Sequence, residues 1–132
     1  PADVTRSVLR AMERPLVRGV THPVNTWMAL DVKEIVKAAR PTQTAVELNL
    51  SKIAGLEAPL MQFLEWVEEY DAPLMVNTDA HIADELGRWE RAAPLLPLIR
   101  PDRVLNRSVD TACAFFGCAL PHRAALPNEV DA

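Results

Sequence analysis

The chain has 132 residues, of which 49% are hydrophobic and 24% are charged, and its formal net charge is −4. These values are typical of one globular domain and exclude a collagen-like repeat, a disulfide-rich miniprotein and a disordered tail. No apolar run approaches the roughly 20 residues of a membrane-spanning helix, and no signal peptide is evident at the start. Because nucleic-acid binding depends on basic residues, the acidic balance disfavours that class of partner.

The two cysteines, Cys113 and Cys118, lack the spacing of a metal-binding pair. We therefore expect them to be free thiols in a reducing compartment. Together with the absence of membrane and secretion signals, this predicts a cytoplasmic protein.

The first part of the chain alternates between helical and extended patterns. Apolar residues recur at helical spacing over residues 3–13, and Pro15 ends that pattern. Residues 16–21 resemble a short strand. Asp31 can cap a second helix, with Glu34 in the capping-box position three residues later. The apolar face of this helix consists of Val32, Ile35, Val36 and Ala39.

The middle of the chain continues this alternation. Residues 45–50 alternate apolar and polar side chains, which predicts a strand with Glu47 and Asn49 on one face. Pro59 suits the first turn of a third helix, and residues 73–77 form the next expected strand. The buried face of the third helix consists of Leu60, Phe63, Leu64 and Val67.

The last part of the chain predicts a helix over about residues 82–94 and a short strand over 102–106. Ser108 can cap a final helix, and Gly117 is a natural stop for it. We expect a loose tail from about residue 121 onward. Strands that alternate with helices indicate a parallel α/β sheet with right-handed crossovers. Both a doubly wound sheet and part of a (β/α) barrel fit this order, although no glycine-rich nucleotide-binding turn is present.

Polar side chains follow three of the predicted strands at their carboxyl ends, where ligands bind in parallel α/β folds. They are His22, Asn49 with Glu47, and Asp79 with His81. Two imidazoles and a carboxylate at one rim would suit zinc or manganese. Each residue also has an ordinary interpretation: His22 as a loop residue, Asp79 as a helix cap, and Glu47 and Asn49 as hydrogen-bonding residues. No nucleophile motif is present, so an enzyme of this kind would use metal-activated water.

Four segments along residues 3 to 117 resemble, in order and spacing, motifs of the PHP (polymerase and histidinol phosphatase) family. The resemblance is to its stand-alone bacterial phosphatase branch, which has a His-Pro after a strand, then Leu-Glu-Ile-Asn, Gly-Ser-Asp-x-His and Ile-Leu-Asn. Here the segments read Thr21-His22-Pro23, Val46-Glu47-Leu48-Asn49, Asn77-Thr78-Asp79-Ala80-His81 and Val104-Leu105-Asn106.

The resemblance implies a distorted (β/α)₇ TIM-like barrel whose rim holds two or three divalent metal ions that hydrolyse phosphate monoesters. It implies that His22, Asp79 and His81 are metal ligands, with zinc as the first expectation and manganese or iron as alternatives. Asn49 and Glu47 match rim positions, but no ligand role is carried over to them. The implied substrate is a small phosphorylated molecule.

The chain lacks the family's N-terminal His-x-His, a later histidine and a bridging glutamate, and Asn77 replaces a glycine. Residues 1–132 are therefore expected to form a single partial domain, the C-terminal half of the barrel. Such a half would hold an incomplete active site and would pair with the missing N-terminal half or with a second copy. Two alternatives are a non-catalytic, truncated PHP-like binding or assembly module and the PHP domain of a DNA polymerase.

Overall fold

A three-stranded parallel sheet lies at the centre of the computed structural model, which describes residues 2–118. Strands β1 (Gly19–Val20), β2 (Ala45–Asn49) and β3 (Leu74–Asn77) lie in that order across the sheet. The predicted α/β class with parallel strands is confirmed. Over residues 2–118 the sheet is open, and a complete barrel is not formed. The tail expected from about residue 121 lies outside the described residues.

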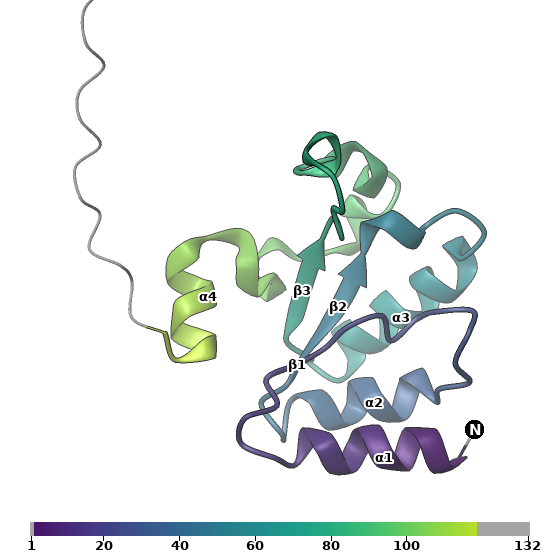
Figure 1. The fold of residues 1–132 in the computed structure, drawn as a ribbon, viewed down its shortest axis with the longest axis vertical. Coiled ribbons are helices and arrows are strands. Elements are labelled where there is room, and N and C mark those ends of the chain that lie inside the picture. Colours follow the sequence, from purple (N-terminus) through teal and green to yellow (C-terminus); the bar gives the residue numbers. More distant parts are fainter. Residues whose placement is uncertain (1, 119–132) are drawn as a thin grey trace, which may run out of the picture.

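Because the three strands are parallel, their carboxyl ends all point toward the same edge of the sheet, which β2 and β3 reach together (Figure 1). Val20 lies opposite Val46, and Asn49 lies opposite Asn77. The predicted alternation along β2 is confirmed, because Val46 and Leu48 join the hydrophobic core. In Figure 1, β2 and β3 run on to the upper edge of the sheet, whereas β1 ends lower, level with the start of β2.

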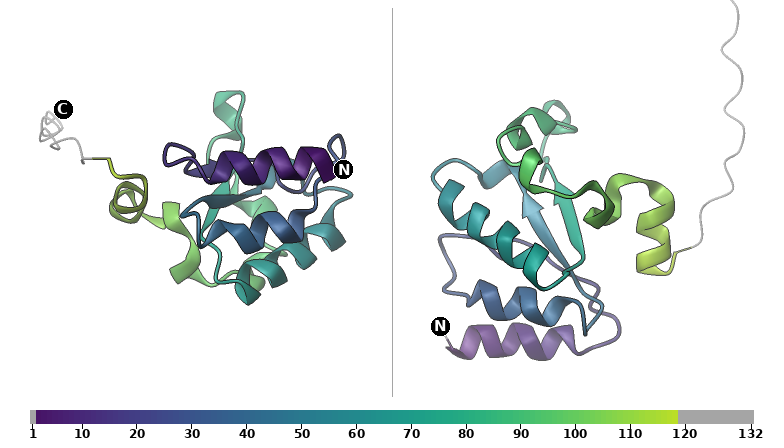
Figure 2. Two further views of the ribbon diagram at one scale, coloured as in Figure 1. Left: turned by 90° about the horizontal axis from the view of Figure 1, so that it is seen from below. Right: turned by 180° about the vertical axis from the view of Figure 1, so that it is seen from behind.

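Three helices, α1 (Ala2–Met12), α2 (Val32–Ala39) and α3 (Glu57–Glu69), supply most of the rest of the core, to which Ala92 and Leu95 also belong. Figure 2 shows α3 in front of the strands when the molecule is seen from behind, so it covers the rear face of the sheet. The predicted Asp31 cap is confirmed, since the Asp31 carboxylate accepts from the Glu34 backbone N–H at 3.2 Å. Within residues 2–118, no helix combines the length and the apolar character that a membrane crossing needs.

The helix predicted over residues 82–94 is wrong, because this region forms only short 3₁₀ segments. Gly87 interrupts it with a φ of 72°, and Leu86 is 71% exposed, so no continuous apolar face stabilises a long helix. The segments are Ala83–Glu85, Trp89–Ala92 and Leu96–Leu98.

The strand predicted over residues 102–106 is also wrong. Val104 forms a single bridge with Leu74, and the residues on either side are in 3₁₀ turns. Beyond this bridge, the Asn106 side chain makes the hydrogen bonds to β3 that a neighbouring strand would make. Its Oδ1 accepts from the Val76 backbone N–H at 3.0 Å, and its Nδ2 donates to the Val76 carbonyl at 2.8 Å.

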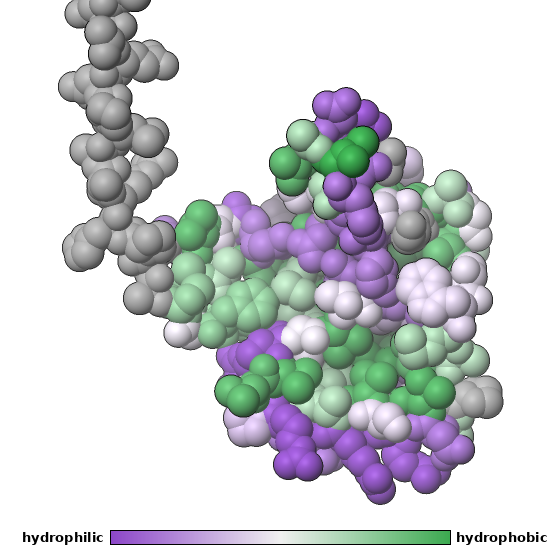
Figure 3. Space-filling model, viewed as in Figure 1, coloured by the Kyte–Doolittle hydropathy of each residue, from purple (hydrophilic) through white to green (hydrophobic). Residues whose placement is uncertain are grey.

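The last helix, α4 (Val109–Phe116), has the predicted ends. The Ser108 hydroxyl accepts from the Thr111 backbone N–H at 3.2 Å, and Gly117 closes the helix with a φ of 71°. No residue of α4 is buried, however, and Val109 is 65% exposed. Figures 1 and 3 show α4 beside the main body, with apolar side chains on its surface.

Candidate functional site

The candidate site lies where β1 and β3 end, and its central pair is His22 and Asp79. The His22 imidazole Nε2 lies 3.9 Å from an Asp79 carboxylate oxygen, and both side chains are roughly a quarter exposed. Both residues have left-handed backbones, with φ of 50° and 51°. Because a non-glycine residue in this region costs about 1–2 kcal/mol, other contacts must hold these two turns in place.

Asn49 and Ser51 connect the two members of this pair. The Asn49 Oδ1 atom accepts from the backbone N–H of Ser51 at 2.9 Å, and Asn49 Nδ2 lies 3.2 Å from His22 Nδ1. The Ser51 hydroxyl lies 3.0 Å from the Asp79 carboxylate. Sequence reasoning missed Ser51, although its place two residues beyond a strand end was a usable signal.

The backbone N–H of Ser51 fixes the orientation of the Asn49 amide. A backbone N–H can only donate, so the atom that faces it is the Asn49 oxygen and the Asn49 nitrogen faces His22. His22 Nδ1 therefore accepts this hydrogen bond. In its neutral form, His22 then carries its proton on Nε2, on the side of Asp79.

The pKa of Asp79 is lowered by its neighbours. Burial raises the pKa of this carboxyl, but hydrogen bonds from Asn49 and Ser51 and the nearby imidazoles of His22 and His81 outweigh that effect. Asp79 is therefore ionised at neutral pH. Its alternative role as a helix cap is wrong, because the next helical segment begins at Ala83 and Asp79 does not cap it.

Two hydrogen bonds hold His81 next to Asp79. Its Nδ1 donates to the main-chain carbonyl of Asp79 at 2.7 Å, and its backbone N–H donates to Glu85 at 2.9 Å. His81 is exposed. The structure thus brings His22 and Asp79 together and leaves His81 beside them.

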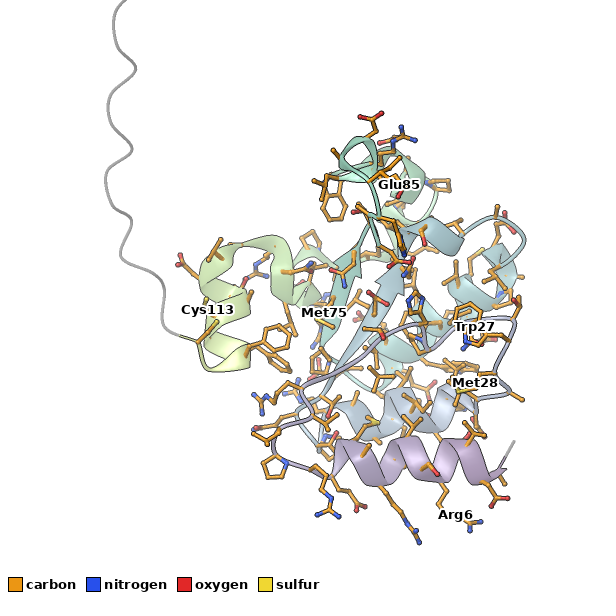
Figure 4. The ribbon with its side chains drawn as sticks, viewed as in Figure 1. Arg6, Trp27, Met28, Met75, Glu85 and Cys113 are labelled. Atoms are coloured by element: carbon orange, nitrogen blue, oxygen red, sulfur yellow. The ribbon has the colours of Figure 1, made fainter. Side chains whose placement is uncertain are left out.

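Trp27 borders the site on the loop after β1, as the side-chain view shows (Figure 4). Its ring meets the His22 imidazole edge to face, with ring centres 5.6 Å apart, and it is 60% exposed. Asn25 shapes this loop: its Nδ2 donates to the His22 carbonyl, and its Oδ1 accepts from the backbone N–H groups of Trp27 and Met28.

Glu47 and Asn77 support the site from the sheet. Glu47 accepts from the His22 backbone N–H at 2.9 Å and from Asn77 Nδ2 at 2.7 Å. Glu47 and Asn49 are both almost fully buried. The structure therefore places these two predicted rim residues beneath the site.

The side chains at the site are of the types that bind divalent metals, but they are too few for a stable metal site. Imidazole and carboxylate are ordinary zinc and manganese ligands, yet a stable site takes three or four protein donors. Within residues 2–118, no group of three or more His, Cys, Asp or Glu side chains is arranged to hold an ion. The residues that the structure describes therefore do not by themselves fit a complete metal site.

The chain is similar to bacterial proteins of about twice the matched length. One from Syntrophotalea carbinolica, named "Probable phosphatase", is 30% identical over 119 residues, which cover 86% of this chain and 50% of that protein. One from Shewanella amazonensis with the same name is 32% identical over 117 residues, covering 82% and 47%. A third, from Proteus mirabilis, is 30% identical over 112 residues, covering 80% and 46%.

The third relative is named "Probable phosphatase PMI1003", so all three carry the name of a probable phosphatase. The chain spans about half the length of the relatives it matches. No family model matches the chain.

Proposed function

We propose that this chain is part of a phosphatase that hydrolyses phosphate monoesters with the help of divalent metal ions. The observation that supports this most directly is the approach of His22 Nε2 to within 3.9 Å of the Asp79 carboxylate at the carboxyl edge of the sheet. The same chain is about 30% identical to proteins named as phosphatases. Its four motifs also resemble the PHP family, and we propose that the sheet is part of a barrel of that kind.

We further propose that His22, Asp79 and His81 contribute ligands, and that the remaining ligands come from outside residues 2–118. Zinc is the first choice of ion, with manganese or iron as alternatives. A bound divalent ion would lower the pKa of water and neutralise charge on the phosphoryl group. The source of the missing ligands is the other half of a longer protein or a second copy of this chain.

The residues of this chain prepare the site for that role. Asp79 is held ionised by its hydrogen bonds, and Asn49 fixes the orientation of the His22 imidazole. Trp27 covers one side of this imidazole. These contacts keep a carboxylate and an imidazole side by side at the open edge of the sheet, where a small phosphorylated substrate can reach them.

A chimera tests this proposal. Residues 2–118 would replace the matched segment of the Syntrophotalea carbinolica relative, and hydrolysis of p-nitrophenyl phosphate would be measured with added zinc or manganese. We expect turnover that Asp79→Ala reduces by at least about 10²-fold, whereas Asp110→Ala on the exposed surface of α4 leaves it unchanged. A folded chimera that turns over equally well with Asp79→Ala would refute the assignment.

The oligomeric state of the 132-residue chain separates the two sources of missing ligands. A dimer at micromolar concentration, measured by light scattering, would favour a second copy. A monomer that binds zinc only in the chimera would favour the other half of a longer protein. A folded chimera with neither bound metal nor turnover would instead favour the non-catalytic binding or assembly module.

A further inference from the structure

Glu47 is a buried carboxylate without a cationic partner. It lies on the central strand β2 and is 6% exposed. Within residues 2–118, none of the ion pairs involves it. Burial of an unpaired carboxylate is unfavourable unless hydrogen bonds stabilise the charge. The contacts of Glu47 therefore indicate why a charge is retained at this position.

Both oxygens of Glu47 accept hydrogen bonds from the turns that carry the candidate site. One oxygen accepts from the backbone N–H of His22 at 2.9 Å, and the other accepts from Asn77 Nδ2 at 2.7 Å. His22 is itself a site residue, and Asn77 ends β3 two residues before Asp79. A single side chain thus joins the end of β1 to the end of β3.

The neighbouring amides show that both of these groups must donate. Asn106 Oδ1 accepts from the Val76 backbone N–H, so Asn106 Nδ2 faces Asn77 and donates to its Oδ1 at 3.0 Å. Asn77 must then direct its own Nδ2 toward Glu47. The His22 backbone N–H and Asn77 Nδ2 can both only donate here, and a carboxylate offers an acceptor oxygen to each of them. A glutamine has one acceptor oxygen, so its NH₂ group would lie against one of these two donors.

We infer that Glu47 is a positioning residue that fixes the His22 turn against Asp79 by accepting from both strand ends. It acts through the His22 backbone, whose left-handed φ of 50° sets the direction of the imidazole. Since its two oxygens accept from the His22 backbone N–H and from Asn77, we assign Glu47 to positioning and not to contact with substrate. The inference deepens the proposed phosphatase site and rests on that function only for its catalytic consequence.

Amide hydrogen exchange in the 132-residue chain, followed by NMR, tests this role. Glu47→Gln should raise the exchange rate of the His22 amide about 10-fold relative to that of Leu48 in β2, since a charge-assisted hydrogen bond is lost. A purely structural role would speed both amides together and leave their ratio unchanged. An unchanged ratio in a folded Glu47→Gln chain would overturn the inference. Glu13→Gln, on the exposed surface after α1, is the matched control.

Asn77→Ala provides a second test if Glu47→Gln does not fold. Asn77 has no hydrogen bond with His22, yet its loss should raise the same exchange ratio, because Glu47 loses its second anchor. The cross-peaks between the His22 and Trp27 rings should also weaken. If Asn77→Ala leaves both the ratio and these cross-peaks unchanged, Glu47 does not transmit position from β3 to His22.

These measurements do not depend on catalysis, so they distinguish this inference from the proposed function. If the chimera is inactive but the exchange ratio rises, Glu47 positions His22 and the phosphatase assignment fails. If the chimera is active, Glu47→Gln should lower kcat by about 10²-fold, because a small displacement of a site residue has an effect of that size.

Discussion

The side-chain amide of Asn106 pairs with both backbone polar groups of Val76, with distances of 3.0 Å and 2.8 Å. The pairing imitates one residue of a neighbouring strand and completes the outer side of β3 at this point. It explains how β3 keeps its hydrogen bonds although residues 102–106 do not form the expected strand.

Asn106→Ala should destabilise the fold by about 1–3 kcal/mol, because it leaves buried backbone groups of β3 without partners. Urea unfolding followed by circular dichroism would measure this change. Asn106→Asp keeps the acceptor for the Val76 N–H and loses only the donor, so the Val76 amide should stay protected from exchange. Equal loss of Val76 protection in both variants would contradict the assigned geometry. Gln62→Ala, at an exposed position of α3, is the control variant.

The exposed ion pair between Arg100 and Asp102 should lower the pKa of the Asp102 carboxyl, which can be measured directly. Hydrogen bonding to Arg100 holds the pKa of Asp102 below its ordinary value of 3.8. Because the pKa is lower in the folded state, this contribution to stability is complete above the ordinary pKa and disappears as the pH falls through the lowered one.

Arg100→Ala should therefore return the pKa of Asp102 toward 3.8, as followed by a carbon NMR titration of the carboxyl. The same variant should make unfolding less dependent on pH in the acidic range. Arg6→Ala, on the distant helix α1, should leave the Asp102 titration as it is (Figure 4). The effect should shrink at high ionic strength, because exposed ion pairs are screened by salt.

Arg18 should control the attachment of α4 to the main body. Its guanidinium lies 5.0 Å from the centre of the Phe115 ring and donates to the Phe115 carbonyl. Since no residue of α4 is buried, Arg18→Ala should speed amide exchange throughout α4 while β2 stays protected. Arg14→Ala, an exposed neighbour, should have no such effect. Unchanged exchange in α4 would show that other contacts hold the helix.

The left-handed backbone at His22 predicts that two small substitutions differ in their effect on stability. His22→Gly should be about 1 kcal/mol more stable than His22→Ala, because glycine adopts a φ of 50° without strain and alanine does not. Urea unfolding of both variants checks this difference. Equal stability would show that the backbone relaxes to another conformation when the imidazole is removed.

The sequence predicted those features whose causes are local or periodic. The Asp31 cap depends on residues a few positions apart, and the alternation along 45–50 depends on the two-residue period of a strand. The segment 82–98 was not predictable in this way, because Gly87 and the exposed Leu86 remove the tertiary packing that a helix there requires. Local spacing alone overestimated its helical order.

For the candidate site, the rule that strand ends converge correctly predicted that His22 and Asp79 lie near each other. Their role as metal ligands, together with that of His81, stays a prediction. The contacts of Asn106 could not be assigned from the sequence, because they depend on the register between strands. Ser51 was missed, although its place just beyond a strand end was a usable signal.

At His22 and Asp79, the left-handed backbone lowers the stability of the fold, whereas the side chain is needed for the proposed chemistry. Glycine would relieve the backbone at either position and would also remove the imidazole or the carboxylate. Variants of this chain selected only for resistance to heat should therefore accumulate glycine at positions 22 and 79. Selection that also requires the proposed phosphatase activity should retain the strained residues and gain its stability elsewhere, for example on the exposed surface of α4.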